Sequence, residues 1–438
     1  MMNIDKLFKV AKEKGVSDIQ VYQSNSNNLS INIYKGDVEK YEIAESSSLV
    51  IKGIYNNKMG TYRTEVFEDS LIDEIVDTII ASAKVIDSLD DAIIYAGDDK
   101  YEEVEGLYSQ ELTDLDVAKK IELAKKLDKQ FYDADSRVKH VEASYSERTN
   151  SVLLKNSKGL ELKNKANASY IVGEVIVNDG EDQRTGFDVQ ITNDFSDYDV
   201  DKFVNEIVED ALASLGAKPV PSKNYPIVFS SLAFATLFSA FQGIFSAQAV
   251  QKGLSLLKGK LETEIGSSLV NVVDDPFMKK SSSSRSFDDE GVATKHKYLI
   301  KDGVLKTFLH DLVTAKKDGV ESTGNSFGGG ISAVNLKVEA GDATLEEMFN
   351  SMESGLYITN VQGAHAGANA VSGDFSLQAA GYLIENGKKV QPVALITVAG
   401  NFIEMLKNVE TVGNKLKMTY FGITCPAIKI KSMPVSGK

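Results

Sequence analysis

Residues 363–387 read GAHAGANAVSGDFSLQAAGYLIENG, and they indicate the fold more clearly than any other part of the chain. The first half has small residues at nearly every other position, which lets another backbone segment approach closely or lets the chain adopt positive φ. The second half places the triplet Glu385–Gly387 between the β-rich runs GYLI and KKVQPVALITV, which predicts a β-hairpin. The stretch therefore predicts a tightly packed β-rich domain.

A second hairpin is predicted upstream of this stretch. Residues 296–311 read HKYLIKDGVLKTFLHD, in which KDG separates two β-rich runs. Residues 217–226 read AKPVPSKNYP and hold three of the seven prolines. Each proline fixes its own φ and removes a backbone donor, so this segment predicts a stiff connector. We expect a β-rich, mostly antiparallel C-terminal domain over residues 222–438, with one buried helix and a short helix at 345–352.

The first half predicts an α+β domain over residues 1–218. Helical spacing of apolar residues marks 4–14, 71–86, 117–131 and 200–215, and short alternating β-type runs fill 19–64 and 140–192. The triplet SKG at 157–159 separates two such runs and predicts a hairpin. An acidic loop can divide the domain into two subdomains, about 1–100 and 110–218. The fold class is therefore α+β.

No charged residue occurs between Lys223 and Lys252, a run long enough to cross a bilayer. Serines, a threonine and glutamines interrupt it and Pro226 splits it, so we expect a strand followed by one buried helix rather than a membrane span. Four phenylalanines recur at steps of four, three and four, on one face of that helix: Phe234, Phe238, Phe241 and Phe245. Such a face usually packs in a core, and stacking on a ligand is the alternative.

Composition and charge narrow the class of protein. A chain of 438 residues with 42% hydrophobic composition is long enough for two or three domains. The 63 acidic residues outnumber the 48 basic ones, and the net charge of −15 repels a polyanion, so we expect no direct nucleic-acid contact and no membrane contact. Cys425 is the single cysteine, which excludes an internal disulfide, and the charged N-terminus does not read as a signal peptide. We expect a cytoplasmic protein.

The familiar patterns of catalytic and metal sites do not occur. The four histidines show no short ligand spacing, and the acidic clusters at Asp274–Asp275 and Asp288–Glu290 lack the spacing of a calcium loop. STGN (Ser322–Asn325) and the SFGGG that follows lack the lysine of a phosphate-binding loop, and no GxSxG nucleophile motif is present. We therefore expect no catalytic residue, no metal site and no cofactor in this chain.

The glycine-rich block at 361–376 has two interpretations. It is either a tight loop packed on the sheet, with Asp374 capping a turn, or one wall of a groove in which an extended peptide adds to a strand edge. Five polar residues are the candidates for groove or interface contacts, all of them expected to be exposed: Asn325, His365, Asn369, Asp374 and Glu385.

Several blocks together resemble the TldD/PmbA family, in particular its PmbA or TldE-like branch, which also carries the label modulator of DNA gyrase. They are STGN, SGDFS followed by GYLIENG, RSFDDEGV at 285–292 and ITVAGNFIEMLKNV at 396–409. In the active branch, the resemblance implies, a helix carries HExxxH and a cysteine near the C-terminus joins its histidines on a metal. The corresponding region here reads LFSAFQGIFSAQAVQKG, with no His, Asp or Glu. A helix without donors cannot supply two ligands.

The resemblance implies a metal-free, non-catalytic subunit of a cytoplasmic peptidase complex. Its expected partners are a TldD-like metal-bearing subunit carrying HExxxH and peptide substrates for maturation or degradation, and the isolated chain is expected to be able to form a homo-oligomer. Two alternatives remain open. One is a stand-alone peptidase or hydrolase with an unrecognised site, and the other is a binding protein that acts on a topoisomerase or its inhibitor.

Overall fold

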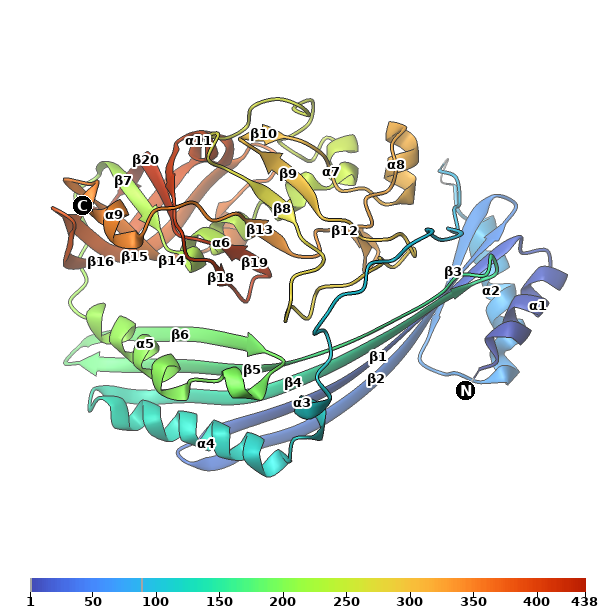
Figure 1. The fold of residues 1–438 in the computed structure, drawn as a ribbon, viewed down its shortest axis with the longest axis horizontal. Coiled ribbons are helices and arrows are strands. Elements are labelled where there is room, and N and C mark those ends of the chain that lie inside the picture. Colours follow the sequence, from blue (N-terminus) through green and yellow to red (C-terminus); the bar gives the residue numbers. More distant parts are fainter. Residues whose placement is uncertain (1, 88–89) are drawn as a thin grey trace.

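One long antiparallel sheet organises the first half of the chain in this computed structural model, which describes residues 2–87 and 90–438 (Figure 1). Its six strands follow the order β3-β2-β1-β4-β5-β6. They are β1 (Asp18–Tyr34), β2 (Asp37–Tyr55), β3 (Lys58–Thr64), β4 (Val138–Asn156), β5 (Glu161–Asp179) and β6 (Asp182–Thr192). Both predicted subdomains therefore contribute strands to a single sheet.

The strands are much longer than the sequence predicts. The runs DIQVYQ and LSINIYKG are one strand of 17 residues, and the two runs after them are one strand of 19 residues. The separating segment QSNSNN has no apolar alternation, which is why the sequence predicts a break there. In the fold it stays extended because β2 and β4 pair with β1 on both sides through this segment. The prediction of short strands was wrong for this reason.

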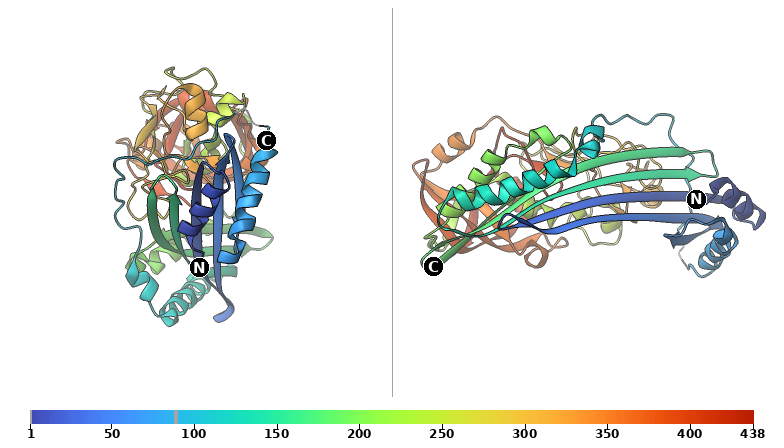
Figure 2. Two further views of the ribbon diagram at one scale, coloured as in Figure 1. Left: turned by 90° about the vertical axis from the view of Figure 1, so that its right-hand side faces the viewer. Right: turned by 90° about the horizontal axis from the view of Figure 1, so that it is seen from below.

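Four helices cover one face of the sheet, in two separate groups (Figure 2). At one end, α1 (Ile4–Glu13) and α2 (Ile72–Lys84) pack on Ile19 and Val21. At the other end, α4 (Val117–Ala134) and α5 (Val200–Ala213) pack on Ile31 and Ile33. These four side chains all lie at odd positions of β1 and therefore on one face. The opposite face turns toward the C-terminal half, and Gln20 donates across to the backbone carbonyl of Asp289 at 3.2 Å.

Two further six-stranded sheets and a two-stranded hairpin make up the second half. Their orders are β10-β9-β8-β13-β19-β18 and β16-β15-β14-β7-β20-β17. All pairs are antiparallel except β7 with β14 and β13 with β19, so the expected α+β class with a mostly antiparallel C-terminal domain is confirmed.

The strands of the first of these sheets are β8 (Val272–Asp274), β9 (Lys297–Lys301), β10 (Val304–Leu305), β13 (Leu336–Val338), β18 (Lys417–Met418) and β19 (Ile423–Cys425). Those of the second are β7 (Lys223–Phe229), β14 (Ser354–Gln362), β15 (Asp374–Glu385), β16 (Lys388–Asn401), β17 (Val409–Val412) and β20 (Ile428–Ser436). The hairpin is β11 (Ser326–Phe327) with β12 (Gly330–Ile331). Short helices and 3-10 turns outside the segment after β7 include η1 (Asp69–Leu71), α3 (Gln110–Asp114), η2 (Phe195–Asp197), α8 (Leu312–Asp318), α9 (Leu345–Asn350), α10 (Ala364–Gly367) and α11 (Phe402–Lys407).

The predicted turns are confirmed where the sequence places them. The ENG turn joins β15 to β16, and its central residues Asn386 and Gly387 have φ of 49° and 77°, as a two-residue turn of this handedness requires. A Cβ on Gly387 would lie 2.0 Å from Oδ1 of Asn350, so a side chain there would displace the Asn350 amide. The KDG and SKG turns likewise close the hairpins β9–β10 and β4–β5.

The predicted continuous helix after β7 is instead three short elements. They are α6 (Ser231–Ser239), η3 (Gln242–Phe245) and α7 (Ala247–Gln251). Gly243, a poor helix former, lies in the middle segment, and Ser246 is extended so that Ala247 N–H reaches the carbonyl of Leu309. The four phenylalanines are all buried in the core as predicted, and Phe241 stacks on Phe402 with 4.4 Å between ring centroids. Within the described part of the chain, no helix has the length and apolarity that a bilayer span requires.

Candidate functional site

The segment in which the resemblance implies metal ligands has none. Residues 237–253, which run from the end of α6 through η3 and α7, hold no His, Asp, Glu or Cys. Beside α6, the thiol of Cys425 is buried and donates to the carbonyl of Ser231 at 3.1 Å. Burial raises the pKa of this thiol to about 12, whereas a metal ligand must be a thiolate. Across residues 2–87 and 90–438, no three His, Cys, Asp or Glu side chains gather into a group that could hold an ion. The residues present do not fit a catalytic metal.

Asn325 belongs to a buried structural network. Its side chain is fully buried, which corrects the expectation that it is exposed. Its amide nitrogen donates to Asp274 Oδ2 at 2.7 Å, and its amide oxygen accepts from Lys297 Nζ at 3.1 Å. Lys297 also pairs with Asp274 at 3.0 Å, and burial lowers the pKa of that lysine. Three interior polar groups thus satisfy one another and hold the loop after α8 against β8 and β9.

The glycine-rich block folds back on β15. A Cβ on Gly367 would lie 2.4 Å from the carbonyl oxygen of Ser376, so the close backbone approach expected from the small residues is present. Asn369 is exposed, but its Oδ1 accepts from the backbone N–H groups of Val371 and Ser372. The pKa of Asp374 lies below its usual range because the side chains of Asn401 and Ser372 donate to its carboxylate. Both side chains therefore help to shape the loop.

His365 and Glu385 are exposed, at separate places. His365 lies in α10, at the Asp374 end of β15, whereas Glu385 ends that twelve-residue strand. At about 3.3 Å per residue, the two ends of β15 are roughly 36 Å apart. The structure therefore brings His365, Asn369 and Asp374 together and leaves Asn325 and Glu385 apart from them.

A groove runs between the two halves of the molecule, along the outer edge of β6. Three adjoining pockets of about 330, 310 and 330 Å³ are lined by successive parts of this strand, residues 183–187, 187–188 and 188–191. The opposite wall comes from β14, β15 and β16, with Leu232 of α6. In Figure 1, β6 lies on the side of the long sheet that faces the C-terminal half, with β14, β15 and β16 above it. We call these three pockets together the β6 groove.

The β6 groove is acidic. Six carboxylates line it, against three cations. The carboxylates are Asp188, Asp197, Asp199, Glu206, Glu209 and Asp210, and the cations are Arg184, Lys202 and Lys417. Partial removal from water raises the pKa of Asp210, which the nearby cations Lys389 and Lys417 partly offset. The groove therefore attracts positively charged groups.

Exposed apolar side chains rim the same groove. Leu395 is 69% exposed, Phe187 39% and Met418 37%. Leu395 also has φ of +57°, in the left-handed region that costs a leucine free energy. It occupies a bulge of β16, where the pairing with β15 shifts between Ala379 and Gly381. A strained and exposed leucine marks this wall as a candidate contact surface.

A polar and aromatic bridge crosses the groove at its centre. Lys417 Nζ lies 2.7 Å from Asp188 Oδ2, joining the C-terminal half to β6. Beside this pair, the rings of Phe187 and Tyr420 meet edge to face with centroids 5.5 Å apart. The bridge separates the pocket beside residues 183–187 from the pocket beside residues 188–191.

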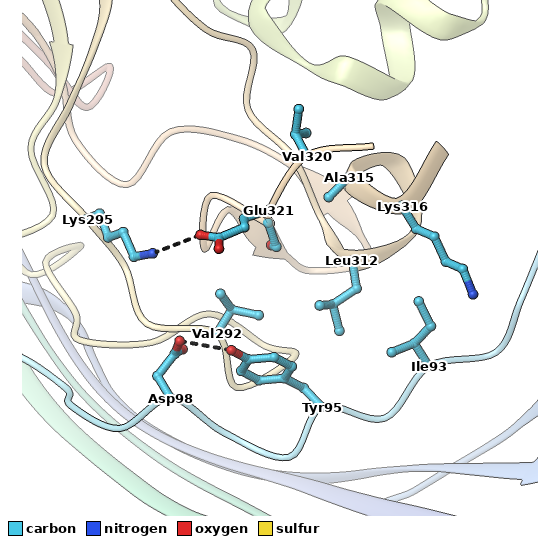
Figure 3. Close-up of a pocket in the computed structure, with 11 residues that line it drawn as sticks. Ile93, Tyr95, Asp98, Val292, Lys295, Leu312, Ala315, Lys316, Val320 and Glu321 are labelled. Atoms are coloured by element: carbon cyan, nitrogen blue, oxygen red, sulfur yellow. Dashed lines mark hydrogen bonds and ion pairs between the residues drawn. The ribbon is translucent and has the colours of Figure 1, made fainter. Parts of the chain in front are cut away.

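A second concave site lies where the segment after α2 crosses α8 (Figure 3). This pocket, of about 490 Å³, is lined by Ile93, Tyr95, Leu312 and other side chains. Its polar groups are already engaged: Tyr95 donates to Asp98 at 2.8 Å, and Asp98 accepts from Ala293 N–H at 2.7 Å. Burial and this carboxylate raise the pKa of Tyr95 well above its usual value. The pocket is part of the seam that fastens residues 93–101 to the C-terminal half.

Two family domains account for most of the chain. Residues 110–215 match the PmbA/TldA metallopeptidase central domain, and residues 222–437 match the PmbA/TldA metallopeptidase C-terminal domain. The proline-rich connector at 217–226 spans the end of the gap between the two matches and the first residues of the second match. The class is thus that of metallopeptidase-related α+β proteins. The chain belongs to the PmbA/TldD metallopeptidase family.

Individual relatives agree with this assignment over nearly the full length. The chain is 26% identical to the metalloprotease PmbA of Escherichia coli O157:H7 over 437 residues, covering 97% of this chain and 93% of that protein. A crystal structure from Thermotoga maritima, assigned as a modulator of a DNA gyrase, is 34% identical with a TM-score of 0.93 and covers 99% of both chains. TldE from Thermococcus kodakarensis has the same fold, with a TM-score of 0.90 at 23% identity, covering 99% of this chain and 100% of that one.

The sequence predicted β6 as a strand but not the β6 groove. Its segment RTGFDVQIT alternates like an interior strand, and nothing in it indicates that β6 ends the sheet. The left-handed Leu395 lies within PVALITV, a run that predicts regular strand. The one available signal is the excess of acidic residues in 188–210, which the sequence alone does not connect with β16.

Proposed function

We propose that this chain is a metal-free, non-catalytic subunit of a peptidase complex and helps to hold peptide substrates for maturation or degradation. In this proposal it pairs with a TldD-like subunit that carries HExxxH and supplies the metal. The observation that carries it is the composition of residues 237–253, which hold no His, Asp, Glu or Cys where the resemblance implies two metal-binding histidines. The protonated thiol of Cys425 adds none.

The chain's own contribution would be binding and positioning. Hydrolysis of a peptide bond needs an activated water, and the α6 region offers no group to activate it. The β6 groove offers an open strand edge, exposed apolar side chains and negative charge. Such a surface can hold an extended peptide while a second subunit provides the reacting groups. We place the complex in the cytoplasm, where a lone thiol such as Cys425 stays reduced.

Some of the five polar candidates fit this role better than others. We propose contacts to peptide or partner for His365, which is exposed, and for Asn369 and Asp374 beside it on the glycine-rich block. We assign Asn325 a supporting role because it is buried in the network with Asp274 and Lys297. Glu385, at the other end of β15, fits a contact with a partner subunit rather than with the same peptide.

A mixing experiment tests the proposal. The purified chain, a purified HExxxH-bearing relative and their equimolar mixture are each incubated with unfolded polypeptide, and cleavage is followed by mass spectrometry. We expect cleavage by the mixture that exceeds the summed rates of the separate chains at least tenfold and that a chelator abolishes. Chelator-sensitive cleavage by this chain alone would contradict the proposal, and so would a mixture no more active than its parts.

The naming of the Thermotoga relative as a modulator of a DNA gyrase favours a second candidate, a protein that binds a topoisomerase or its inhibitor. The net charge of −15 disfavours contact with DNA itself. Capture of purified gyrase by this chain in the absence of any peptidase partner would support this second function, and no capture at micromolar concentration would remove it.

A further inference from the structure

The backbone of β6 is open on the side that lines the groove. The sheet ends at β6, so only β5 pairs with it among the described strands. The N–H of Val189 turns away from β5, because it donates to the carboxylate of Asp188 at 2.8 Å. N–H and C=O groups alternate in direction along a strand, and β5 and β6 pair without a register shift. Gln183, Thr185 and Phe187 therefore direct their backbone groups outward as well.

These outward groups lie beside the pocket whose far wall is β14 to β16. Residues 183–187 and the strained Leu395 line the same pocket, of about 330 Å³. The side chains of Gln183, Thr185 and Phe187 are exposed. A row of five residues spans roughly 17 Å at about 3.4 Å per residue, and the Lys417–Asp188 bridge closes its end.

We infer that the β6 groove binds an extended, positively charged peptide segment, which adds as a strand to residues 183–187 of β6 and places an apolar side chain against Phe187 and Leu395. The inference rests on the proposed function and names the class of peptide that the function takes. Main-chain hydrogen bonds to β6 supply affinity for any extended segment, since they do not depend on side chains.

Charge selects among extended segments. The groove lining carries six carboxylates and three cations. Glu206 and Glu209 on α5 are exposed and line the pocket beside residues 187–188, which adjoins the end of the proposed peptide site. The net negative charge would repel an acidic segment. Charge therefore contributes more to the selectivity of the groove than to its affinity. The bound strand therefore belongs to basic, unfolded polypeptide.

A binding assay with the full-length chain tests this inference. The probe is a fluorescent heptapeptide, Lys-Leu-Lys-Val-Lys-Thr-Lys, and the control peptide has glutamate in place of every lysine. We expect micromolar binding of the basic probe by fluorescence anisotropy and at least tenfold weaker binding of the acidic one. N-methylation of successive probe amides should weaken binding at every second position, because alternate N–H groups face β6. Equal binding of both peptides, or no such alternation, would overturn the inference.

Two variants locate the site. Thr185→Pro removes one outward N–H at a strand edge, where proline is tolerated, and should weaken binding at least tenfold. Glu206→Gln should weaken it at least threefold at low salt, whereas Glu122→Gln, an exposed change on α4, should not. Unchanged affinity in a folded Thr185→Pro protein would refute the site. If that variant fails to fold, unchanged affinity in Glu206→Gln does so instead.

The groove and the proposed function can fail separately. Binding of the probe as expected, without activation of a metal-bearing partner, would support the peptide site and contradict the proposed function. Equal activation of the partner by the wild type and by Thr185→Pro would support the proposed function and contradict the peptide site on β6. If the partner subunit displaces the bound probe, with one probe released per subunit bound, β6 is a contact between subunits. This result would overturn the inference.

Discussion

At the scale of single residues, the most unusual position is Leu395. Its left-handed backbone costs a leucine about 1–2 kcal/mol, and its side chain recovers little by burial because it is 69% exposed. Glycine would suit the backbone there without strain. The fold therefore keeps a leucine at a position where neither the backbone nor the core needs one, which agrees with a contact role in the β6 groove.

This reasoning predicts that Leu395→Gly does not destabilise the protein. Relief of strain offsets the larger entropy of the unfolded glycine chain, so the free energy of unfolding should stay level or rise by up to about 1 kcal/mol. The matched control is Val390→Gly in the same strand, 50% exposed and without positive φ, which should lower it by roughly 0.5–1 kcal/mol. Urea titration of the two variants measures both values. A larger loss for Leu395→Gly than for Val390→Gly would contradict the strain argument.

Asp288 is the residue whose protonation should be visible in stability. Its carboxylate is fully buried, and burial raises its pKa to about 7, although the backbone N–H groups of Glu290, Val292 and Ser326 donate to it. A carboxyl group with a raised pKa binds its proton more tightly in the folded state than in the unfolded one. The protonated carboxyl group of Asp288 therefore makes its full contribution to the free energy of unfolding below about pH 4, the pKa in the unfolded chain. This contribution is lost as the pH rises to about 7, the pKa in the folded protein.

We predict that Asp288 lowers the free energy of unfolding of the wild type by about 2–4 kcal/mol between pH 4.5 and 7.5. The Asp288→Asn variant should lack this part of the decrease. The measurement is the difference between wild type and variant across that range, because Asp128, Asp210 and Glu290 also have raised pKa values and act in the same direction in both proteins. If the free energies of unfolding of wild type and variant depend on pH in the same way, the prediction is contradicted. The three N–H donors would then keep the Asp288 carboxylate ionised in spite of its burial.

At the scale of elements, the loop at 286–294 joins the halves of the molecule. Tyr101 donates to the carbonyl of Gly291 at 2.7 Å, and Asp98 accepts from Ala293 N–H at 2.7 Å. Gln20 of β1 reaches Asp289 of the same loop. One short loop thus holds β1 and the segment after α2, which positions the long sheet, and with it β6, against the C-terminal half.

Removing one of these contacts should loosen the seam. Asp98→Ala leaves Ala293 N–H and the Tyr95 hydroxyl without their acceptor, which costs about 1–3 kcal/mol for a buried group. We expect a lower melting temperature and faster amide exchange in 286–294. Asp99→Ala, the exposed neighbour, serves as the control and should change neither. Equal effects of both substitutions would show that Asp98 does not hold the loop.

What the sequence predicts at this scale follows local rules. The hairpin turns at 157–159, 302–303 and 386–387 were predicted because asparagine, aspartate and glycine accept positive φ wherever they occur. The single strand across QSNSNN was missed because its pairing partners lie far away in the chain. The sequence does not indicate the break at Ser246, because the hydrogen bonds of its neighbours Phe245 and Ala247 to the distant Leu309 decide it. For the same reason Asn325 was expected to be exposed, since its partners Asp274 and Lys297 lie 51 and 28 residues away.

At the scale of the whole molecule, the chain combines the family's architecture with an α6 region that has no metal donors. The two matched domains span 110–215 and 222–437, and the buried core around α6 is apolar. The surface, by contrast, offers an acidic groove between the halves and an open strand edge. This contrast supports the proposed division of labour, in which this chain binds the peptide and a partner activates water.

Metal stoichiometry tests this central claim most directly. The chain and its complex with an HExxxH-bearing subunit are each exposed to equimolar zinc, freed of unbound ion and analysed by plasma mass spectrometry. We predict less than 0.1 equivalent of zinc on the lone chain and about one equivalent per heteromeric pair, held by the partner. A lone chain that retains one equivalent of zinc, and loses peptidase activity when that ion is removed, would contradict the account.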